Sequence, residues 1–169
     1  MSRTALVLGT DHGFQRRDPK FTESQHKRFV AFVTATVKAN GVLALAEENS
    51  PEAFADDKIA ESTVETVARE LGLKHRHCDP GRKTRAALEI RQENDIRASF
   101  MFEKVSEAVI QQRIEESMRT RERHWLGQLL DFNMWPVLFI CGADHSLAFL
   151  NLLRANNVDT VLVAQDWGT

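Results

Sequence analysis

The stretch Thr-Ala-Leu-Val-Leu-Gly-Thr-Asp-His, residues 4–12, decides the fold class of this chain. It begins with a short apolar run that ends at Gly9, which is typical of a strand buried on both faces of a sheet. Further strand-like runs follow along the chain, and helical patterns separate them. The predicted strands span residues 4–8, 42–46, 73–78, 137–140 and 160–164.

Helices are predicted from capping signals and from apolar residues at helical spacing. Thr22-Glu23-Ser24-Gln25 has the spacing of a capping box, and Pro51 after Ser50 is typical of a first helical turn. Residues 79–135 form a far longer connection than one crossover needs, so we expect an extra helical segment that covers one end of the sheet. The predicted helices span residues 22–40, 50–72, 98–132 (one helix, or two in line) and 142–156.

Strands that alternate with helices predict an α/β fold. The chain has 169 residues, of which 43% are hydrophobic and 27% charged, and these values fit one globular domain. We therefore expect a single α/β domain over residues 1–169. It should contain a mostly parallel sheet of about five strands, with helices on both faces and a long helical segment before the fourth strand.

Composition excludes several classes of protein. The 22 Lys and Arg residues against 24 Asp and Glu give a net charge of -2, which offers no electrostatic drive toward nucleic acid or an anionic membrane. No apolar run approaches the roughly 18 residues needed to span a bilayer. The start of the chain has no signal-peptide pattern, so we expect a cytoplasmic protein. Cys78 and Cys141 lack CxxC spacing and are expected to be free thiols.

Polar residues follow four of the predicted strands. In an open parallel sheet, ligands bind beyond the carboxyl ends of the strands, so these residues are expected to meet at one edge. They are Asp11 and His12, Glu47 and Glu48, Cys78 and Asp79, and Asp144 and His145.

Two of these strand ends share the pattern Gly-x-Asp-His, at residues 9–12 and 142–145. Their imidazoles could be metal ligands, or a general base with its partner. In the plainer interpretation, each Asp caps the following turn and each His is a solvated loop residue. The repetition at two strand ends favours the functional interpretation.

Two other acidic positions also need partners. Glu47 and Glu48 directly follow apolar residues, where two carboxylates are costly unless one is paired or bound to a cation. Glu122 interrupts a helical apolar stripe that Arg121 flanks. We predict that Arg121 and Glu122 are buried and that Arg121 binds an acid such as Glu47 or Glu48; an ordinary ion pair at the margin of the core is the alternative.

His75 and His77 alternate along a predicted strand and so share one face. A metal site is one interpretation of this spacing. A half-exposed strand face is the favoured one.

The order of these motifs resembles the TraB/Tiki, ChaN and erythromycin-esterase group of α/β proteins, and in particular its small bacterial stand-alone members. The resemblance rests on Gly-x-x-His after the first strand, Glu-Glu after the second, an inward Arg on a late helix and Gly-x-x-His after the penultimate strand. The matching stretches are GTDHG at 9–13, AEEN at 46–49, CDP at 78–80, RERHW at 121–125 and FICGADH at 139–145.

The resemblance implies hydrolysis at a site that contains His12, Glu47, Glu48, Arg121 and His145. The Tiki branch cleaves peptides with a metal, whereas in the esterase branch a His and acids activate water. This sequence shows neither the membrane anchor of the first branch nor the large helical insertions of the second. The substrate of either branch is therefore not transferred to it.

Two hypotheses follow. The first is a small cytosolic hydrolase with a small-molecule or peptide substrate, in which His12, or a metal that it helps to hold, activates water and Arg121 stabilises an oxyanion. The second is a non-catalytic sensor or regulatory module that keeps the pocket to bind a ligand or partner. No nucleotide cofactor is expected, and one divalent ion (Zn, Mn, Co or Fe) would be held by His12, Glu47 and His145. The expected substrate-binding residues are Asp11, Asp79, Glu122, Trp125 and Asp144.

Overall fold

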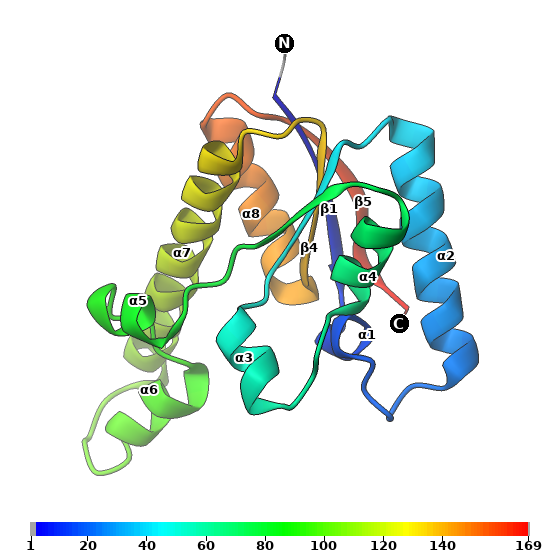
Figure 1. Ribbon diagram of the computed structural model, residues 1–169. Coiled ribbons are helices and arrows are strands. Elements are labelled where there is room, and N and C mark those ends of the chain that lie inside the picture. Colours follow the sequence, from blue (N-terminus) through cyan, green and yellow to red (C-terminus); the bar gives the residue numbers. More distant parts are fainter. Residues whose placement is uncertain (1–2, 169) are drawn as a thin grey trace.

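The computed structural model describes residues 3–168 and contains one five-stranded, all-parallel sheet between two layers of helices (Figure 1). The predicted α/β fold is confirmed. The order across the sheet is β3-β2-β4-β1-β5. The strands are β1 (Thr4–Thr10), β2 (Ala44–Glu47), β3 (Lys74–His77), β4 (Val137–Gly142) and β5 (Asp159–Trp167).

Each central strand is buried on both sides, and its alternate side chains enter two separate cores. Ala5 and Val7 of β1 pack in the core covered by α7 and α8, whereas Leu6 and Leu8 pack in the core covered by α1, α2 and α4. In Figure 1, α7 and α8 lie on one side of the sheet and α2 and α4 on the other. The helices bounding these cores are α1 (His12–Arg16), α2 (Glu23–Asn40), α4 (Thr63–Glu70), α7 (Glu107–Phe132) and α8 (Ala143–Ala155).

The helix predicted for residues 50–72 is two helices, α3 (Pro51–Asp56) and α4. Between them Lys58 adopts a left-handed conformation with φ of 57°. Ser62 then caps α4 by accepting a hydrogen bond from the backbone N–H of Glu65 at 2.8 Å. A new N-cap in the middle of the periodic stretch explains why one helix becomes two.

The segment predicted as helical from residue 98 is interrupted between residues 100 and 106. Residues 98 and 99 end α6 (Glu93–Ser99), which follows α5 (Arg82–Ala87), and α7 begins only at Glu107. Phe102, which fits the predicted apolar stripe, is 93% exposed and lies in the interruption. Helices α5 and α6 supply the expected extra helical segment, and α6 packs against α7 (Figure 1).

The position of the site follows from the strand order. After β1 the chain enters α1, which contributes to one core, and after the neighbouring β4 it enters α8, on the opposite face. Neighbouring strands whose connections leave in opposite directions open a crevice at their carboxyl ends. The register pairs Thr10 with Gly142, so the two Gly-x-Asp-His segments meet at this crevice.

Two predictions about composition can be compared with the fold. Cys78 and Cys141 are both free and buried, as expected. Among the helices of residues 3–168, none combines the length and hydropathy required to cross a bilayer.

Candidate active site

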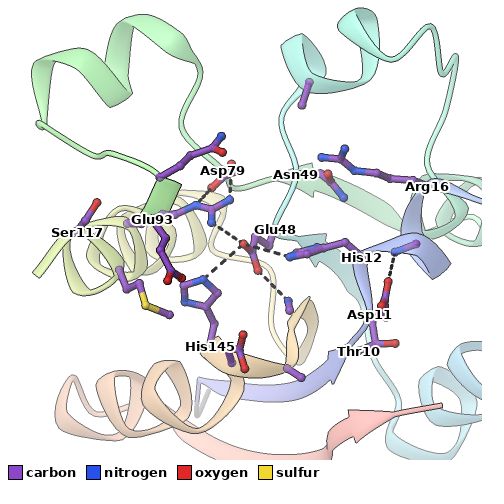
Figure 2. A pocket seen from close by; sticks show the side chains of 18 of the residues that line it. Thr10, Asp11, His12, Arg16, Glu48, Asn49, Asp79, Glu93, Ser117 and His145 are labelled. Atoms are coloured by element: carbon purple, nitrogen blue, oxygen red, sulfur yellow. Dashed lines mark hydrogen bonds and ion pairs between the residues drawn. The ribbon is translucent and has the colours of Figure 1, made fainter. Parts of the chain in front are cut away.

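A pocket of about 770 Å³ lies at the carboxyl ends of the strands, where the segments after β1, β2, β3 and β4 meet α7 (Figure 2). Its volume suits a small-molecule ligand. The predicted site residues that line it are Asp11, His12, Glu48, Asp79, Arg121, Asp144 and His145.

Glu48 is at the centre of the pocket, and its side chain is fully buried. Its Oε2 accepts a hydrogen bond from the backbone N–H of Gly142 at 2.8 Å. Its Oε1 lies 2.8 Å from Nη1 of Arg121, an ion pair outside hydrogen-bond geometry, and 3.6 Å and 3.7 Å from Nε2 of His12 and of His145 (Figure 2). No residue between 3 and 168 donates a hydrogen bond to this oxygen. Two imidazoles therefore face one buried carboxylate oxygen, as the prediction that they share a pocket requires.

The tautomer of His12 follows from its neighbour Gln15. The amide nitrogen of Gln15 donates to Oε2 of Glu47 at 3.0 Å, which turns the amide oxygen of Gln15 toward His12. That oxygen lies 2.9 Å from Nδ1 of His12. Nδ1 must therefore carry the hydrogen, and in the neutral ring Nε2 is a free acceptor that points into the pocket.

Glu122 likewise determines the tautomer of His145. Its Nδ1 lies 2.8 Å from Oε1 of Glu122, whose side chain is 1% exposed and also accepts from Arg119. Nδ1–H donates to this carboxylate, so Nε2 is again the free acceptor. The ring of His145 packs edge-on against Trp125, with ring centroids 4.9 Å apart. His145 is held more rigidly than His12, whose side chain is 43% exposed.

Arg121 links Glu48 to Asp79. Nε and Nη2 of Arg121 donate to the two carboxylate oxygens of Asp79 at 2.6 Å and 2.8 Å. Burial raises the pKa of Asp79, but the hydrogen bonds and charge of Arg121, the charge of Arg85 and the hydrogen bond of Trp125 outweigh burial and hold this pKa below its ordinary value. Glu122 is buried as predicted, whereas the side chain of Arg121 is partly buried, at 23% exposed. Arg121 pairs with an acid as predicted, but its hydrogen bonds go to Asp79, and Glu48 is its ion-pair partner.

Two residues predicted to bind substrate do not line the pocket. Glu122 and Trp125 are 1% and 0% exposed, and both lie behind it. Trp125 donates from Nε1 to Asp79 at 3.0 Å, and Glu122 holds His145. Their place on the inward stripe of α7 points them at the core, so they position the pocket residues.

Glu47 is not in the pocket either, which corrects the expected grouping of Glu47 with His12 and His145 as metal ligands. Successive residues of a strand point to opposite faces. Glu47 shares the face of Leu45 and points toward α1 and α4, whereas Glu48, one residue later, points toward Arg121 and His145 on α7 and α8.

The Glu47 carboxylate has its own set of donors. Its Oε2 accepts from Gln15 and Asn49, and its Oε1 accepts from Ser62 and, at 2.9 Å, from His75. Burial raises its pKa, but the hydrogen bond and charge of His75 and the hydrogen bonds of Ser62 and Asn49 lower it below the ordinary value.

Within residues 3–168, the one group of three or more His, Cys, Asp and Glu side chains whose ligand atoms lie within 4.8 Å of one another is Glu47, His75 and His77. This group could hold a metal ion. The alternation of His75 and His77 allowed a metal site, although a half-exposed strand face was the favoured interpretation, and the register that sets β3 beside Glu47 was not visible in the sequence. Gln15, Asn49 and Ser62 also carried no recognisable signal.

Comparison with known proteins adds no relative. No family model, curated protein sequence or solved structure matches this chain.

Proposed function

We propose that the protein is a hydrolase that cleaves an ester or amide bond of a small polar molecule in the Glu48 pocket. One observation carries the proposal. The free Nε2 atoms of His12 and His145 both lie within 3.7 Å of Oε1 of Glu48, and each opposite ring nitrogen is bound to a side-chain acceptor. Acceptors that face one another are stabilised by a group that donates to them, and a water molecule can donate to two of these three.

His12 is the proposed general base. Its Nε2 faces the open pocket, whereas His145 is nearly enclosed and Glu48 is already paired with Arg121. Nε2 of His12 takes a proton from water while the water oxygen attacks the carbonyl carbon of the substrate. The proton then passes from His12 to the leaving group as its bond to that carbon breaks.

The negative oxygen of the intermediate is proposed to lie at the start of α8. Gly142 is the N-cap of this helix and has no side chain to bind the backbone N–H groups of the first turn. Those groups, from residues that line the pocket, favour a negatively charged oxygen. The guanidinium of Arg121 adds positive charge nearby.

We assign no step of this reaction to a metal ion. Glu47 points away from His12 and His145, and the cation beside Oε1 of Glu48 is the guanidinium of Arg121. The donor set expected for a divalent ion therefore does not assemble in this pocket. The cytoplasmic location and the absence of a nucleotide cofactor remain part of the proposal.

The test is hydrolysis of a panel of small carboxylic esters, lactones, amides and dipeptides by the wild type and by Glu48→Gln. The amide keeps the size of the side chain and removes its charge. Glu115→Gln, on the exposed face of α7, is the matched control. We expect turnover of at least one class, a loss of about 100-fold or more in Glu48→Gln and no loss in the control. Binding of panel members with no turnover would favour the sensor or regulatory module instead.

A further inference from the structure

A second cluster of polar side chains lies on the opposite face of the sheet from Glu48. The parallel register sets His75 beside Leu45 and His77 beside Glu47. Because alternate residues of a strand share a face, both imidazoles lie on the face that carries Glu47. His75 and His77 are in edge contact, with ring centroids 4.5 Å apart.

The three ligand atoms have the spacing of a metal site. Oε1 of Glu47 lies 2.9 Å from Nε2 of His75 and 3.5 Å from Nδ1 of His77. Ligand atoms around a tetrahedral zinc ion at bond lengths near 2.0–2.1 Å are about 3.3 Å apart. Small shifts of side chains would therefore bring all three atoms to bonding distance of one ion.

His77 supplies the independent evidence. Its Nδ1 is buried, and no residue between 3 and 168 forms a hydrogen bond with it. Its other nitrogen, Nε2, lies 3.5 Å from Oε2 of Glu65. An imidazole with one nitrogen near a carboxylate and the other directed at a second acidic ligand has the arrangement of a metal-bound histidine with its supporting carboxylate.

We propose that Glu47, His75 and His77 form a binding site for one divalent transition-metal ion of the zinc class, separate from the Glu48 pocket. Two imidazoles and one carboxylate suit zinc and cobalt better than magnesium or calcium, which prefer oxygen ligands. Ion binding displaces the proton by which Nε2 of His75 donates to Glu47.

The surroundings preorganise the carboxylate and leave a path for the ion. Gln15 and Asn49 hold Oε2 of Glu47, so Oε1 faces the histidines. The side chains of His75 and His77 are 12% and 17% exposed, and β3 is an edge strand of the sheet, so an ion reaches them from that side. The bound ion would join β2 to β3. Through Gln15 it would also adjoin His12, without taking part in the proposed hydrolysis.

The test is metal titration of the full chain, purified without an affinity tag and freed of metal by a chelator. Zn²⁺ binding is followed by calorimetry, and the visible spectrum of the Co²⁺ form reports nitrogen ligation in a four-coordinate site. The variants are His77→Ala, which removes one ligand, and Glu65→Gln, which removes the supporting carboxylate. His124→Ala on α7 and His12→Ala in the pocket are the controls.

We expect one ion per wild-type chain and a rise in melting temperature with added Zn²⁺. His77→Ala should weaken binding by more than about 100-fold and abolish the rise, and Glu65→Gln should weaken it by about 10-fold. Should His77→Ala fold poorly, Glu65→Gln carries the test, because its side chain is 39% exposed and tolerates the change. Failure of the wild type to bind one ion, unchanged binding in Glu65→Gln, or loss of binding in His12→Ala would overturn the proposal. None of these readouts depends on hydrolytic activity.

Discussion

Replacing Asp79 by alanine tests the network that supports the pocket. The side chain of Asp79 is 3% exposed and binds Arg121, Arg85 and the indole N–H of Trp125. Removing one partner of a buried ion pair costs about 3–5 kcal/mol, and an unpaired buried N–H costs about 1–3 kcal/mol. Arg121 keeps Glu48 as a partner, which places the expected loss near the lower end, at about 3 kcal/mol.

The loss is measurable by urea unfolding followed by tryptophan fluorescence, since Trp125 is fully buried in the native state. For a chain of this length, about 3 kcal/mol corresponds to a fall of roughly 6–12 °C in melting temperature. Asp56→Ala is the matched control. Its carboxylate pairs with Arg82 at the surface, where both side chains are more than half exposed, so its loss should stay below about 1 kcal/mol. Equal losses in the two variants would refute the assignment of Asp79 as a buried anchor.

Three further predictions concern pH, the glycine at the strand end and the thiols. Because the folded-state pKa of Asp79 lies below its ordinary value of 3.8, its ionised form contributes stability that is present above that value and is lost as pH falls through the folded-state pKa. The difference in unfolding free energy between wild type and Asp79→Asn should therefore be constant between about pH 5 and pH 8 and should shrink below about pH 4. A difference that stays constant at all pH values would contradict this prediction. In Gly142→Ala the new Cβ would lie 2.7 Å from Nε2 of His12 and 3.4 Å from Oε2 of Glu48. The exposed His12 can move aside by up to about 1 Å, so kcat/KM should fall by about 100-fold with little change in melting temperature, and unchanged kinetics would refute this. Burial raises the pKa values of the thiols of Cys78 and Cys141, so a thiol reagent should label them only after unfolding, and rapid labelling of the native protein would contradict their placement.

The sheet and the position of the pocket were predictable because they depend on local patterns. The apolar runs of β1 and β4 end in the same Gly-x-Asp-His motif, and the helix stripes between strands imply a parallel sheet. Parallel strands place their carboxyl ends at one edge, so His12 and His145 could be expected at the same edge, but their meeting depends on the pairing of β1 with β4.

The placement of Glu47 and Glu48 in two separate clusters, on opposite faces of the sheet, was not predictable in the same way. Adjacent residues of a strand point to opposite faces, but only the three-dimensional structure shows that α7 and α8, which carry Arg121 and His145, lie on the face of Glu48. The partnership of Glu47 with His75 and His77 likewise depends on the pairing of β2 with β3. The break between α3 and α4 was missed because the apolar stripe that predicted this helix, from Ala60 to Leu71, lies wholly after α3 and gave no information on whether the helix continues back to Pro51.

The central claim, that His12 is the base of a hydrolase, is tested most directly by His12→Ala with added imidazole. The side chain of His12 is 43% exposed, so its removal should leave the melting temperature nearly unchanged and open a space that free imidazole can enter. On a substrate that the wild type hydrolyses, we predict a loss of about 10²–10⁴-fold in kcat, partly restored by imidazole in proportion to its concentration of neutral base. Wild-type turnover by His12→Ala, or a loss that imidazole does not reverse at all, would contradict the claim.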